Sequence, residues 1–317
     1  MANANQIVSL IQSHFASEDE RFYTLSLQIA AHEARLGHVS TAQQIRELID
    51  KERLNKAKLK VVKFQPDLEN LLYQTNPKNR LNQLVLPEDL KLRIERVLHE
   101  YRQRAKLQKH GLSHRRKIML VGPPGTGKTM TASVIAGELG LPLYVVQMDK
   151  IITKYLGETG AKLRQLFDFI DSQKGVFFFD EFDAIGADRS NENEVGEMRR
   201  ALNSLLQFIE ASYSESIIIA ATNNITLLDK ALFRRFDDIL YYQLPNQKEA
   251  LELVKNSLGT FGKKLNIKEI NGEIVGLSHA QLTQACGDAI KSSILSDLLT
   301  VNHNTLLSSL KEKRTHQ

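Results

Sequence analysis

Residues 121–130 read "VGPPGTGKTM", and this short stretch predicts the local fold of the chain around it. It follows the apolar run "KIML" and precedes "TASVIAGEL", whose composition is typical of a helix. Gly122, Gly127, Lys128 and Thr129 match the spacing G-x-x-x-x-G-K-[ST]. We therefore predict a strand, a glycine-rich loop and a helix, with the backbone N–H groups of the loop turned toward an anionic ligand.

The predicted loop suits a nucleoside triphosphate. Backbone N–H groups can wrap the phosphates only where no Cβ obstructs their approach, and this explains the glycines. Lys128 is expected to reach the β- and γ-phosphates, and the Thr129 hydroxyl is expected to ligate Mg²⁺. The predicted ATP-binding residues are Gly122, Pro123, Pro124, Gly125, Thr126, Gly127, Lys128, Thr129 and Met130.

A second motif, "VFFFDEFD" (residues 176–183), is an apolar run that ends in acidic residues. Adjacent carboxylates repel each other and resist burial, so a purely structural role explains them poorly. Beside a triphosphate, Asp180 is predicted to support Mg²⁺ and Glu181 to accept a proton from the attacking water. A positioned base is typically worth about 10² to 10⁴ in rate. The pair therefore predicts ATP hydrolysis to ADP and phosphate.

Around these motifs, strand-like and helical patterns alternate until the chain reaches Pro245. The strand-like runs, such as "PLYVVQM" and "SIIIAAT", are almost continuously apolar, which is typical of a parallel sheet covered by helices on both faces. After Pro245 only helical patterns remain. The predicted fold class is α/β, a P-loop NTPase parallel sheet with a small all-helical lid and an N-terminal helical bundle.

The chain before this sheet also shows helical spacing. The pattern "SEDE" (residues 17–20) predicts a capped helix start, Gly37 is placed to end that helix, and a further helix is expected from near Ser40. Prolines then indicate a linker. The predicted domains are an N-terminal bundle for partner or substrate recruitment (1–62), a linker (63–83), a nucleotide-binding core (84–244) and a helical lid (245–317).

The composition is that of a globular protein, with 42% hydrophobic residues in a chain of 317. No apolar run approaches the roughly eighteen residues that span a bilayer. The N-terminus lacks the basic start and long apolar middle of a secretory signal. We therefore expect a cytoplasmic protein without a membrane partner. Cys286 is the single cysteine and is expected to be a small core residue.

Basic residues cluster in two places. Residues 51–63 contain six Lys or Arg against one Glu, and residues 102–117 contain seven without any acid. Such runs could meet nucleic acid or an acidic protein surface. Solvated helix faces explain them as well, and we prefer that interpretation.

The loop and the acids together resemble the AAA+ ATPases, and further motifs resemble the protein-remodelling AAA branch of that family. "AATNN" (220–224) is similar to the family's sensor 1, which implies that Asn223 helps to orient the attacking water. "LFRRFDD" (232–238) is similar to the segment whose arginines project into the nucleotide site of a neighbouring subunit. The resemblance implies this role for Arg234 and Arg235, implies the AAA+ strand order, and leaves open which arginine matters more.

The stretch "TKYLGETGAKLRQLF" (153–167) resembles the family's first pore loop and the helix behind it. By this resemblance Tyr155 and Leu156 line a central channel, where an aromatic side chain can grip an extended polypeptide. A half-buried aromatic at a strand-to-helix connection is the alternative interpretation of Tyr155. An arginine supplied in trans is worth about 10³ to 10⁵ in turnover, so the resemblance also implies a homo-oligomer, with a hexamer as the expected ring.

Two stretches depart from the family pattern. In "GLSHAQL" (276–282), His279 and Ala280 stand where the family often has Gly-Ala, and this questions a close backbone approach to the nucleotide. "LVLPEDL" (84–90) replaces the Ile-Gly often found beside the adenine, although the apolar residues 84–86 can still supply a face for the base.

We expect an ATP-driven remodeller or unfoldase, an oligomeric ring that threads or disassembles a protein client or a dedicated partner enzyme. One alternative is a nucleic-acid-dependent AAA+ ATPase, a loader or motor that uses the basic clusters. Its binding would weaken steeply with salt. Another alternative is an ATP-gated adaptor that regulates a partner enzyme through the N-terminal bundle.

Overall fold

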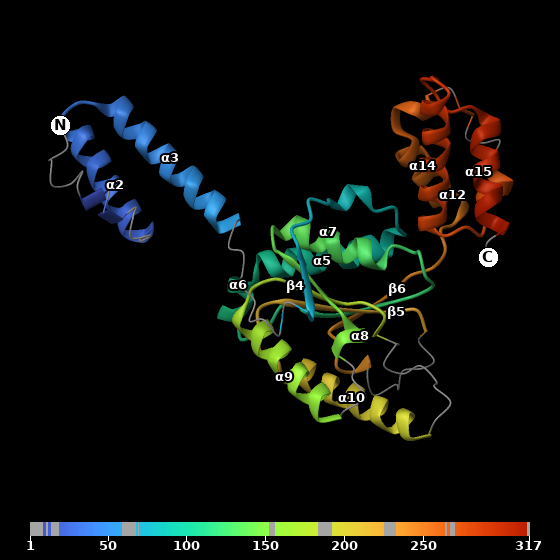
Figure 1. Cartoon of the computed structure of the whole chain (residues 1–317), viewed down its shortest axis with the longest axis horizontal. Helices are drawn as coiled ribbons and strands as arrows, with labels where there is room; N and C mark the ends of the chain where they lie inside the picture. Colours follow the sequence, from blue (N-terminus) through green and yellow to red (C-terminus); the bar gives the residue numbers. More distant parts are fainter. Residues whose placement is uncertain are drawn as a thin grey trace. The chain divides into compact units, whose positions relative to one another are not determined.

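The structure is a computed structural model, and it divides the chain into two compact units, Met1–Phe64 and Gln65–Gln317. Each unit is described by itself (Figure 1). Among the described helices, none combines the length and apolar character that crossing a membrane requires. The residues that the structure describes are 9–10, 12–13, 19–58, 68, 70–151, 156–182, 192–224, 233–263, 265–266 and 270–315.

The first unit contains a helical hairpin. Helix α2 (Asp19–Arg35) and helix α3 (Val39–Lys58) pack against each other, with Tyr23, Ala30 and Ile49 buried. The chain reverses at Gly37, whose φ of +88° lies in the left-handed region that glycine adopts readily. The expected helix end at Gly37 and the new helix near Ser40 are therefore both observed.

The second unit is built on a six-stranded sheet with the order β1-β3-β4-β5-β2-β6. All neighbouring strands are parallel except β1, which pairs antiparallel with β3. The predicted mostly parallel α/β sheet is thereby confirmed. The strands are β1 (Leu72–Thr75), β2 (Lys117–Val121), β3 (Leu143–Val146), β4 (Val176–Phe179), β5 (Ile217–Thr222) and β6 (Asp238–Tyr241).

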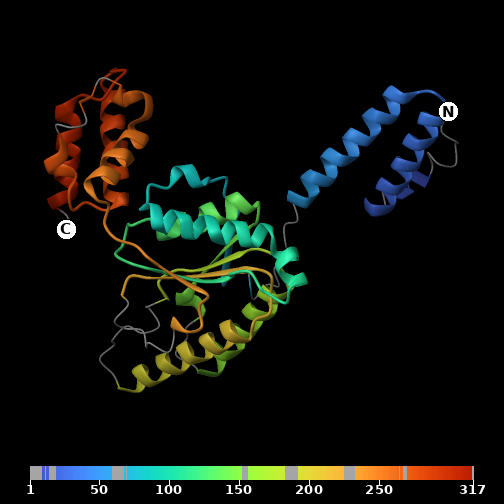
Figure 2. The same ribbon diagram turned by 180° about the vertical axis from the view of Figure 1, so that it is seen from behind.

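Helices cover both faces of the sheet, as Figures 1 and 2 show from opposite sides. Helices α5 (Glu88–Arg102) and α7 (Lys128–Leu139) lie on one face, and α9 (Leu156–Ser172) and α10 (Glu192–Ala211) lie on the other. The central strands β2, β4 and β5 are buried along their whole length, which is why their sequences are apolar runs. Two short helices also belong to this unit: α6 (Arg104–Lys109) precedes β2, and α8 (Met148–Ile151) follows β3.

Strand β1 lies inside the segment 63–83 that the sequence predicts to be a linker. Leu72 is 4% exposed and pairs with Val146, and the Leu71 carbonyl accepts a hydrogen bond from Gln147. A turn of 3-10 helix, η1 (Leu81–Gln83), follows. Part of the predicted linker is therefore an edge strand of the sheet.

The lid is all-helical and has a hydrophobic core of its own. Cys286 is fully buried in it, and burial raises the pKa of its thiol to about 12, as expected for an unreactive core residue. The elements of the lid are α12 (Gln247–Leu258), η4 (Gly259–Gly262), α13 (Asn271–Ile274), α14 (His279–Leu295) and α15 (His303–Thr315).

Candidate nucleotide site

The parallel strands define two edges of the sheet. We call the edge where β2, β4 and β5 end the carboxyl edge, and the edge where they begin the amino edge. Ligands of open α/β sheets bind outside the carboxyl ends of the strands. The glycine loop follows β2, the two acids follow β4, and Asn223 follows β5, so the topology brings three of the predicted motifs to the carboxyl edge.

The glycine loop has a backbone conformation that residues other than glycine adopt only with strain. Gly125 and Gly127 have φ values of +73° and +99°, and Gly127 is the residue from which helix α7 starts. At Gly122, where φ is +155°, a Cβ would lie 2.4 Å from the backbone oxygen of Tyr242. The loop therefore needs glycine at these positions for its own shape as well as for access of phosphate to the backbone.

Lys128 joins the loop to the end of strand β5. Its Nζ donates hydrogen bonds to the carbonyl oxygens of Gly122 (2.7 Å) and Pro123 (2.8 Å) and to Oδ1 of Asn223 (2.8 Å). The Thr126 hydroxyl also donates to the Pro123 carbonyl, at 2.8 Å. The predicted phosphate-binding lysine and the predicted water-orienting amide are thus in direct contact, although 95 residues separate them in the chain.

Oxygen groups suited to a magnesium ion lie next to this lysine. The Thr129 hydroxyl donates to Oδ2 of Asp180 at 3.2 Å. A hydroxyl and one carboxylate fit Mg²⁺, which takes oxygen ligands and usually keeps several waters and substrate phosphates rather than an all-protein cage. The described residues contain no cluster of three or more His, Cys, Asp or Glu side chains that could hold a metal by themselves.

Glu181 has an unusual backbone conformation. Its φ is +50°, which is rare for a residue other than glycine, and its backbone N–H donates to Oδ1 of Asp180 at 3.0 Å. Such conformations concentrate at functional sites, where surrounding structure holds them. Glu181 is exposed and lines the same cavity as Asp180, so the side chain predicted to act as the base is accessible from the cavity.

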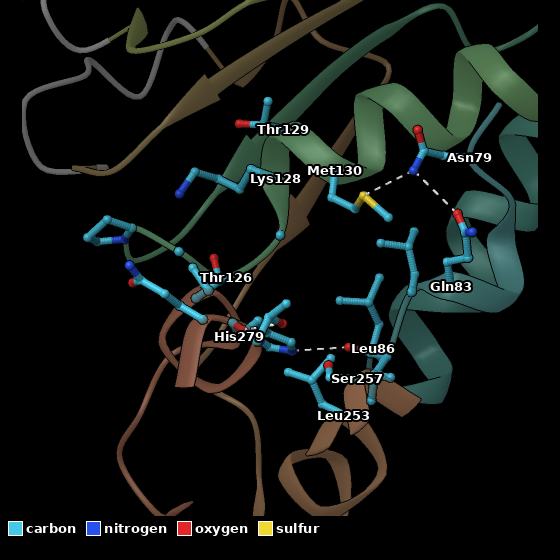
Figure 3. A pocket seen from close by; sticks show the side chains of 18 of the residues that line it. Asn79, Gln83, Leu86, Thr126, Lys128, Thr129, Met130, Leu253, Ser257 and His279 are labelled. Carbon is cyan, nitrogen blue, oxygen red and sulfur yellow. Dashed lines mark hydrogen bonds between the residues drawn. The ribbon is translucent and has the colours of Figure 1, made fainter. Parts of the chain in front are cut away.

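A cavity of about 1040 Å³ opens between the sheet and the lid (Figure 3). Its size fits a nucleotide, because ligand pockets commonly span about 300 to 1,000 Å³. The apolar segment 84–86 lines it, as expected of a face for the base. Residues predicted from the motifs that line the cavity are Pro124, Gly125, Thr126, Gly127, Lys128, Thr129, Met130, Asp180, Glu181 and Asn223.

Other cavity residues carry no motif. These residues come from the predicted linker and from the lid, and no sequence motif marks them as binding residues. Asn79 illustrates this, because its Nδ2 approaches Sδ of Met130 at 3.6 Å, across 51 residues (Figure 3). The cavity-lining residues without a predicted role in binding are Asn79, Asn82, Gln83, Leu253, Asn256, Ser257, Thr283 and Gln284.

The lid approaches the glycine loop closely at the position where the sequence departs from the family pattern. The backbone N–H of Ala280 donates to the Gly125 carbonyl at 2.9 Å. A Cβ on Gly125 would lie 2.7 Å from Oγ of Ser278, the residue that caps helix α14. The His-Ala pair at 279–280 is thus compatible with a close contact between the lid backbone and the phosphate-binding loop.

The two predicted arginine fingers lie at the amino edge. Asp237, just after them, accepts hydrogen bonds from the backbone N–H groups of Arg116 and Lys117 at the start of β2, both at 2.9 Å. The five residues of β2, at roughly 3.3 Å each, put this edge about 16 Å from the glycine loop. Arg234 and Arg235 do not belong to the described lining of the cavity.

The two arginines differ in their surroundings. Arg234 is exposed, whereas the Arg235 side chain is 29% exposed and its Nε lies 3.3 Å from Oε2 of Glu210. Glu210 belongs to the last turn of helix α10, so the Arg235 side chain forms its ion pair within its own subunit.

The basic run at 102–117 is largely engaged within the fold. Lys117 is 8% exposed, and burial lowers the pKa of its ammonium group. Lys106 and Lys109 are exposed. The partners of the others are Glu138 for Arg102, Glu215 for Arg104, Glu100 for Arg115, the carbonyls of Ser212 and Ser214 for Arg116, and the carbonyl of Glu210 for Lys117.

Tyr155 lies outside the described residues, and Leu156 is described only as the first residue of helix α9. Their predicted place in a channel therefore stays a prediction. The same holds for the basic cluster at 51–63, where helix α3 ends at Lys58 and no side chain is described.

Known proteins are similar to the core of this chain, and one relative is similar to almost the whole chain. The family model for the ATPase family associated with various cellular activities (AAA) matches residues 118–244. The chain is 30% identical to the uncharacterized AAA family ATPase y4kL of Sinorhizobium fredii (strain NBRC 101917 / NGR234) over 318 residues, covering 99% of this chain and 96% of that protein.

Two further relatives match only in part. The proteasome-activating nucleotidase of Methanoregula boonei (strain DSM 21154 / JCM 14090 / 6A8) is 33% identical over 213 residues, 64% of this chain and 49% of that protein. The ATP-dependent zinc metalloprotease FtsH of Karelsulcia muelleri (strain DMIN) is 35% identical over 182 residues, 54% of this chain and 29% of that protein. The similarity therefore spans half or less of these two proteins.

Proposed function

The chain belongs to the AAA family of ATPases, and we propose that it works as a homo-oligomeric ring that remodels a protein partner, with each nucleotide held between two subunits. The family resemblance predicted from the motifs is confirmed, and with it the assignment of the chain as an ATPase. The proposal concerns how the subunits share the reaction and what they act on.

We assign the chemistry within one subunit to the carboxyl edge. Lys128 holds the β- and γ-phosphates, and Thr129 and Asp180 hold Mg²⁺, which when bound neutralises charge on those phosphates. Glu181 accepts the proton of the attacking water, and Asn223 helps to orient that water. The contacts of Lys128 with Asn223 and of Thr129 with Asp180 support this assignment.

The observation that carries the shared site is the separation of the arginines from the cavity. Arg234 and Arg235 precede β6 at the amino edge, about one strand length from the glycine loop of the same chain. An arginine side chain cannot bridge that distance. If either arginine is to stabilise the transferred phosphoryl group, it must reach the nucleotide of another subunit, and a closed ring of subunits satisfies every site.

The names of the relatives support a protein client. One is a nucleotidase that activates the proteasome and the other is an ATP-dependent protease, so both printed names concern protein degradation. In this chain we propose that Tyr155 and Leu156 contact the client in a central channel and that the ring is a hexamer. The N-terminal unit is proposed to recruit the client or a partner enzyme.

The nucleic-acid alternative is less well supported by the charges. Of the basic run at 102–117, most side chains already contact acids or carbonyl oxygens of their own chain. Phosphate contacts would have to compete with these interactions. Stimulation of ATP hydrolysis by DNA, with binding that falls steeply between two salt concentrations, would favour this alternative over a protein client.

Mixing two inactive variants tests the shared site. Lys128→Ala leaves a subunit with an arginine to offer but a defective pocket, whereas Arg234→Ala leaves an intact pocket without the arginine. Each variant alone is expected to hydrolyse ATP very slowly, and a mixture is expected to recover turnover where an Arg234→Ala pocket lies next to a Lys128→Ala subunit. A mixture no more active than its components, when both variants assemble normally, would refute the shared site.

The client is tested separately. The Glu181→Gln variant should bind ATP and retain its client, so affinity capture in ATP and in ADP, followed by protein identification, should yield a protein enriched only with ATP. Tyr155→Ala should keep ATP hydrolysis and lose remodelling of that protein. Equal remodelling by Tyr155→Ala would remove the threading mechanism and leave the ATPase assignment intact.

A further inference from the structure

Two consecutive residues at the start of helix α14 make hydrogen bonds from the lid to the rest of the second unit. The Ala280 N–H donates to the Gly125 carbonyl at 2.9 Å, and Nε2 of His279 lies 3.0 Å from the Val85 carbonyl (Figure 3). Gly125, Val85, His279 and Ala280 all line the cavity. The two hydrogen bonds therefore connect the lid to two different walls of the nucleotide site.

The contact of His279 with Val85 has a defined direction. A carbonyl oxygen only accepts, so Nε2 must carry a proton and donate it. Burial lowers the pKa of the His279 ring, which is therefore neutral near pH 7 with its proton on Nε2. The other ring nitrogen, Nδ1, is buried without a hydrogen-bond partner in the described part of the chain, so the contact through Nε2 is what orients the ring.

The acceptor belongs to a segment that is itself fastened to helix α7. Nη1 of Arg80 donates to the Gly137 carbonyl at 2.8 Å, and the Leu81 N–H donates to Oε1 of Glu138 at 3.1 Å. Gly137 allows this approach because a Cβ there would lie 2.3 Å from the Asn79 carbonyl oxygen. Val85, which is 6% exposed, is thereby linked through this segment to the helix that begins at the phosphate-binding loop.

We propose that His279 is a positioning residue that latches the lid over the bound nucleotide and sets the rate at which ADP leaves. The proposal rests on the proposed ATPase site. The core and the lid together line the cavity, so a movement of the lid away from the core widens the exit for nucleotide and must break the hydrogen bond to Val85.

Three variants test the latch. His279→Leu introduces an apolar side chain of comparable bulk and removes the donor, whereas His279→Gln places an amide N–H near the position of Nε2. His303→Leu alters another half-buried histidine of the lid, one that does not line the described cavity, and controls for general weakening of the lid. For each variant, stopped-flow fluorescence measures the release of a ribose-labelled ADP analogue into excess unlabelled ADP, alongside thermal unfolding.

The expected result is a split between the variants. Loss of one neutral hydrogen bond predicts roughly three- to tenfold faster ADP release for His279→Leu, with release within about twofold of wild type for His279→Gln and His303→Leu. Wild-type release by His279→Leu would overturn the latch, and so would equal acceleration by His303→Leu. If the wild-type chain itself bound no ADP, the nucleotide site and the latch would both be wrong, which separates failure of the proposal from failure of its premise.

Discussion

The two edges of one sheet carry different chemistry. At the carboxyl edge, a glycine loop, the Thr129 hydroxyl and two acids line a cavity of about 1040 Å³. At the amino edge, basic side chains contact acids and carbonyl groups, such as Lys117 with the Glu210 carbonyl and Arg104 with Glu215. The first edge offers groups to a ligand, and the second mainly attaches elements of the fold to one another.

The difference suggests a division of labour. Neither Arg234 nor Arg235 is among the described residues that line the cavity at the carboxyl edge. Both arginines lie at the amino edge, which contributes no residue to the described cavity lining. Arg234 is exposed. Asp237, in the same turn, accepts hydrogen bonds from backbone N–H groups at the start of β2. An exposed arginine on a turn that is hydrogen-bonded to the start of β2 is well suited to act on another subunit.

The largest effect is expected at the amino edge. Arg234→Ala should lower turnover by about 10³ to 10⁵, because it removes the positive charge that we propose Arg234 supplies to the phosphoryl group of a neighbouring subunit. Arg235→Ala should cost less, since Arg235 contacts Glu210 of its own chain. Steady-state ATP hydrolysis measures both, with the exposed Lys106→Ala as a control expected to match wild type. Full activity of Arg234→Ala would place all the chemistry at one edge.

At the carboxyl edge, Glu181→Gln should lower turnover by about 10² to 10⁴ while leaving ATP binding nearly unchanged. The amide keeps the size of the side chain and cannot accept the proton of water. Single-turnover hydrolysis and equilibrium binding of ATP separate the two effects. Asp149→Asn, an exposed acid on helix α8, is the matched control. Undiminished turnover of Glu181→Gln would assign the base elsewhere.

The shape of the glycine loop provides a smaller test. Gly122→Ala should destabilise the fold by about 1–3 kcal/mol and weaken nucleotide binding, because its Cβ would collide with the backbone of Tyr242. Gly160→Ala in helix α9, where a Cβ meets nothing within 4 Å, should instead stabilise by about 1 kcal/mol. Urea unfolding of both variants measures the contrast, and equal stabilities would show that the loop tolerates a side chain.

The smallest effect concerns the charges of the amino edge. Hydrogen bonds from Lys174 and Gln108 lower the pKa of Glu215 to about 2. A carboxyl group with a lowered folded-state pKa stabilises the fold above its ordinary pKa near 4.5, and this contribution is lost as the pH falls from about 4.5 toward 2. Because Glu215 is partly exposed, the contribution should be below about 1 kcal/mol. The unfolding free energies of wild type and Glu215→Gln in urea should therefore differ at pH 6, approach each other below about pH 4.5 and become equal near pH 2.

Much of the nucleotide site could be predicted from short segments. The glycine loop and the acids after β4 are contiguous motifs, and their chemistry depends on residues adjacent in the chain. The apolar runs likewise predicted the parallel sheet, because a strand buried on both faces cannot alternate in polarity. The segment 63–83 was harder, since the four residues of β1 form an edge strand with a mixed burial pattern that resembles a loop.

The sequence alone predicts an α/β fold with a phosphate-binding loop, because phosphate binding imposes local requirements on neighbouring residues, and its motifs resemble the AAA family. The contacts of Lys128 with Asn223, the shared cavity of Asn79 and His279 with the loop, and the position of the arginines at the far edge of the sheet emerge only from the three-dimensional structure. The physical reason is that these contacts join residues distant in the chain, and their distances depend on strand order and on how the lid packs, which no local pattern encodes.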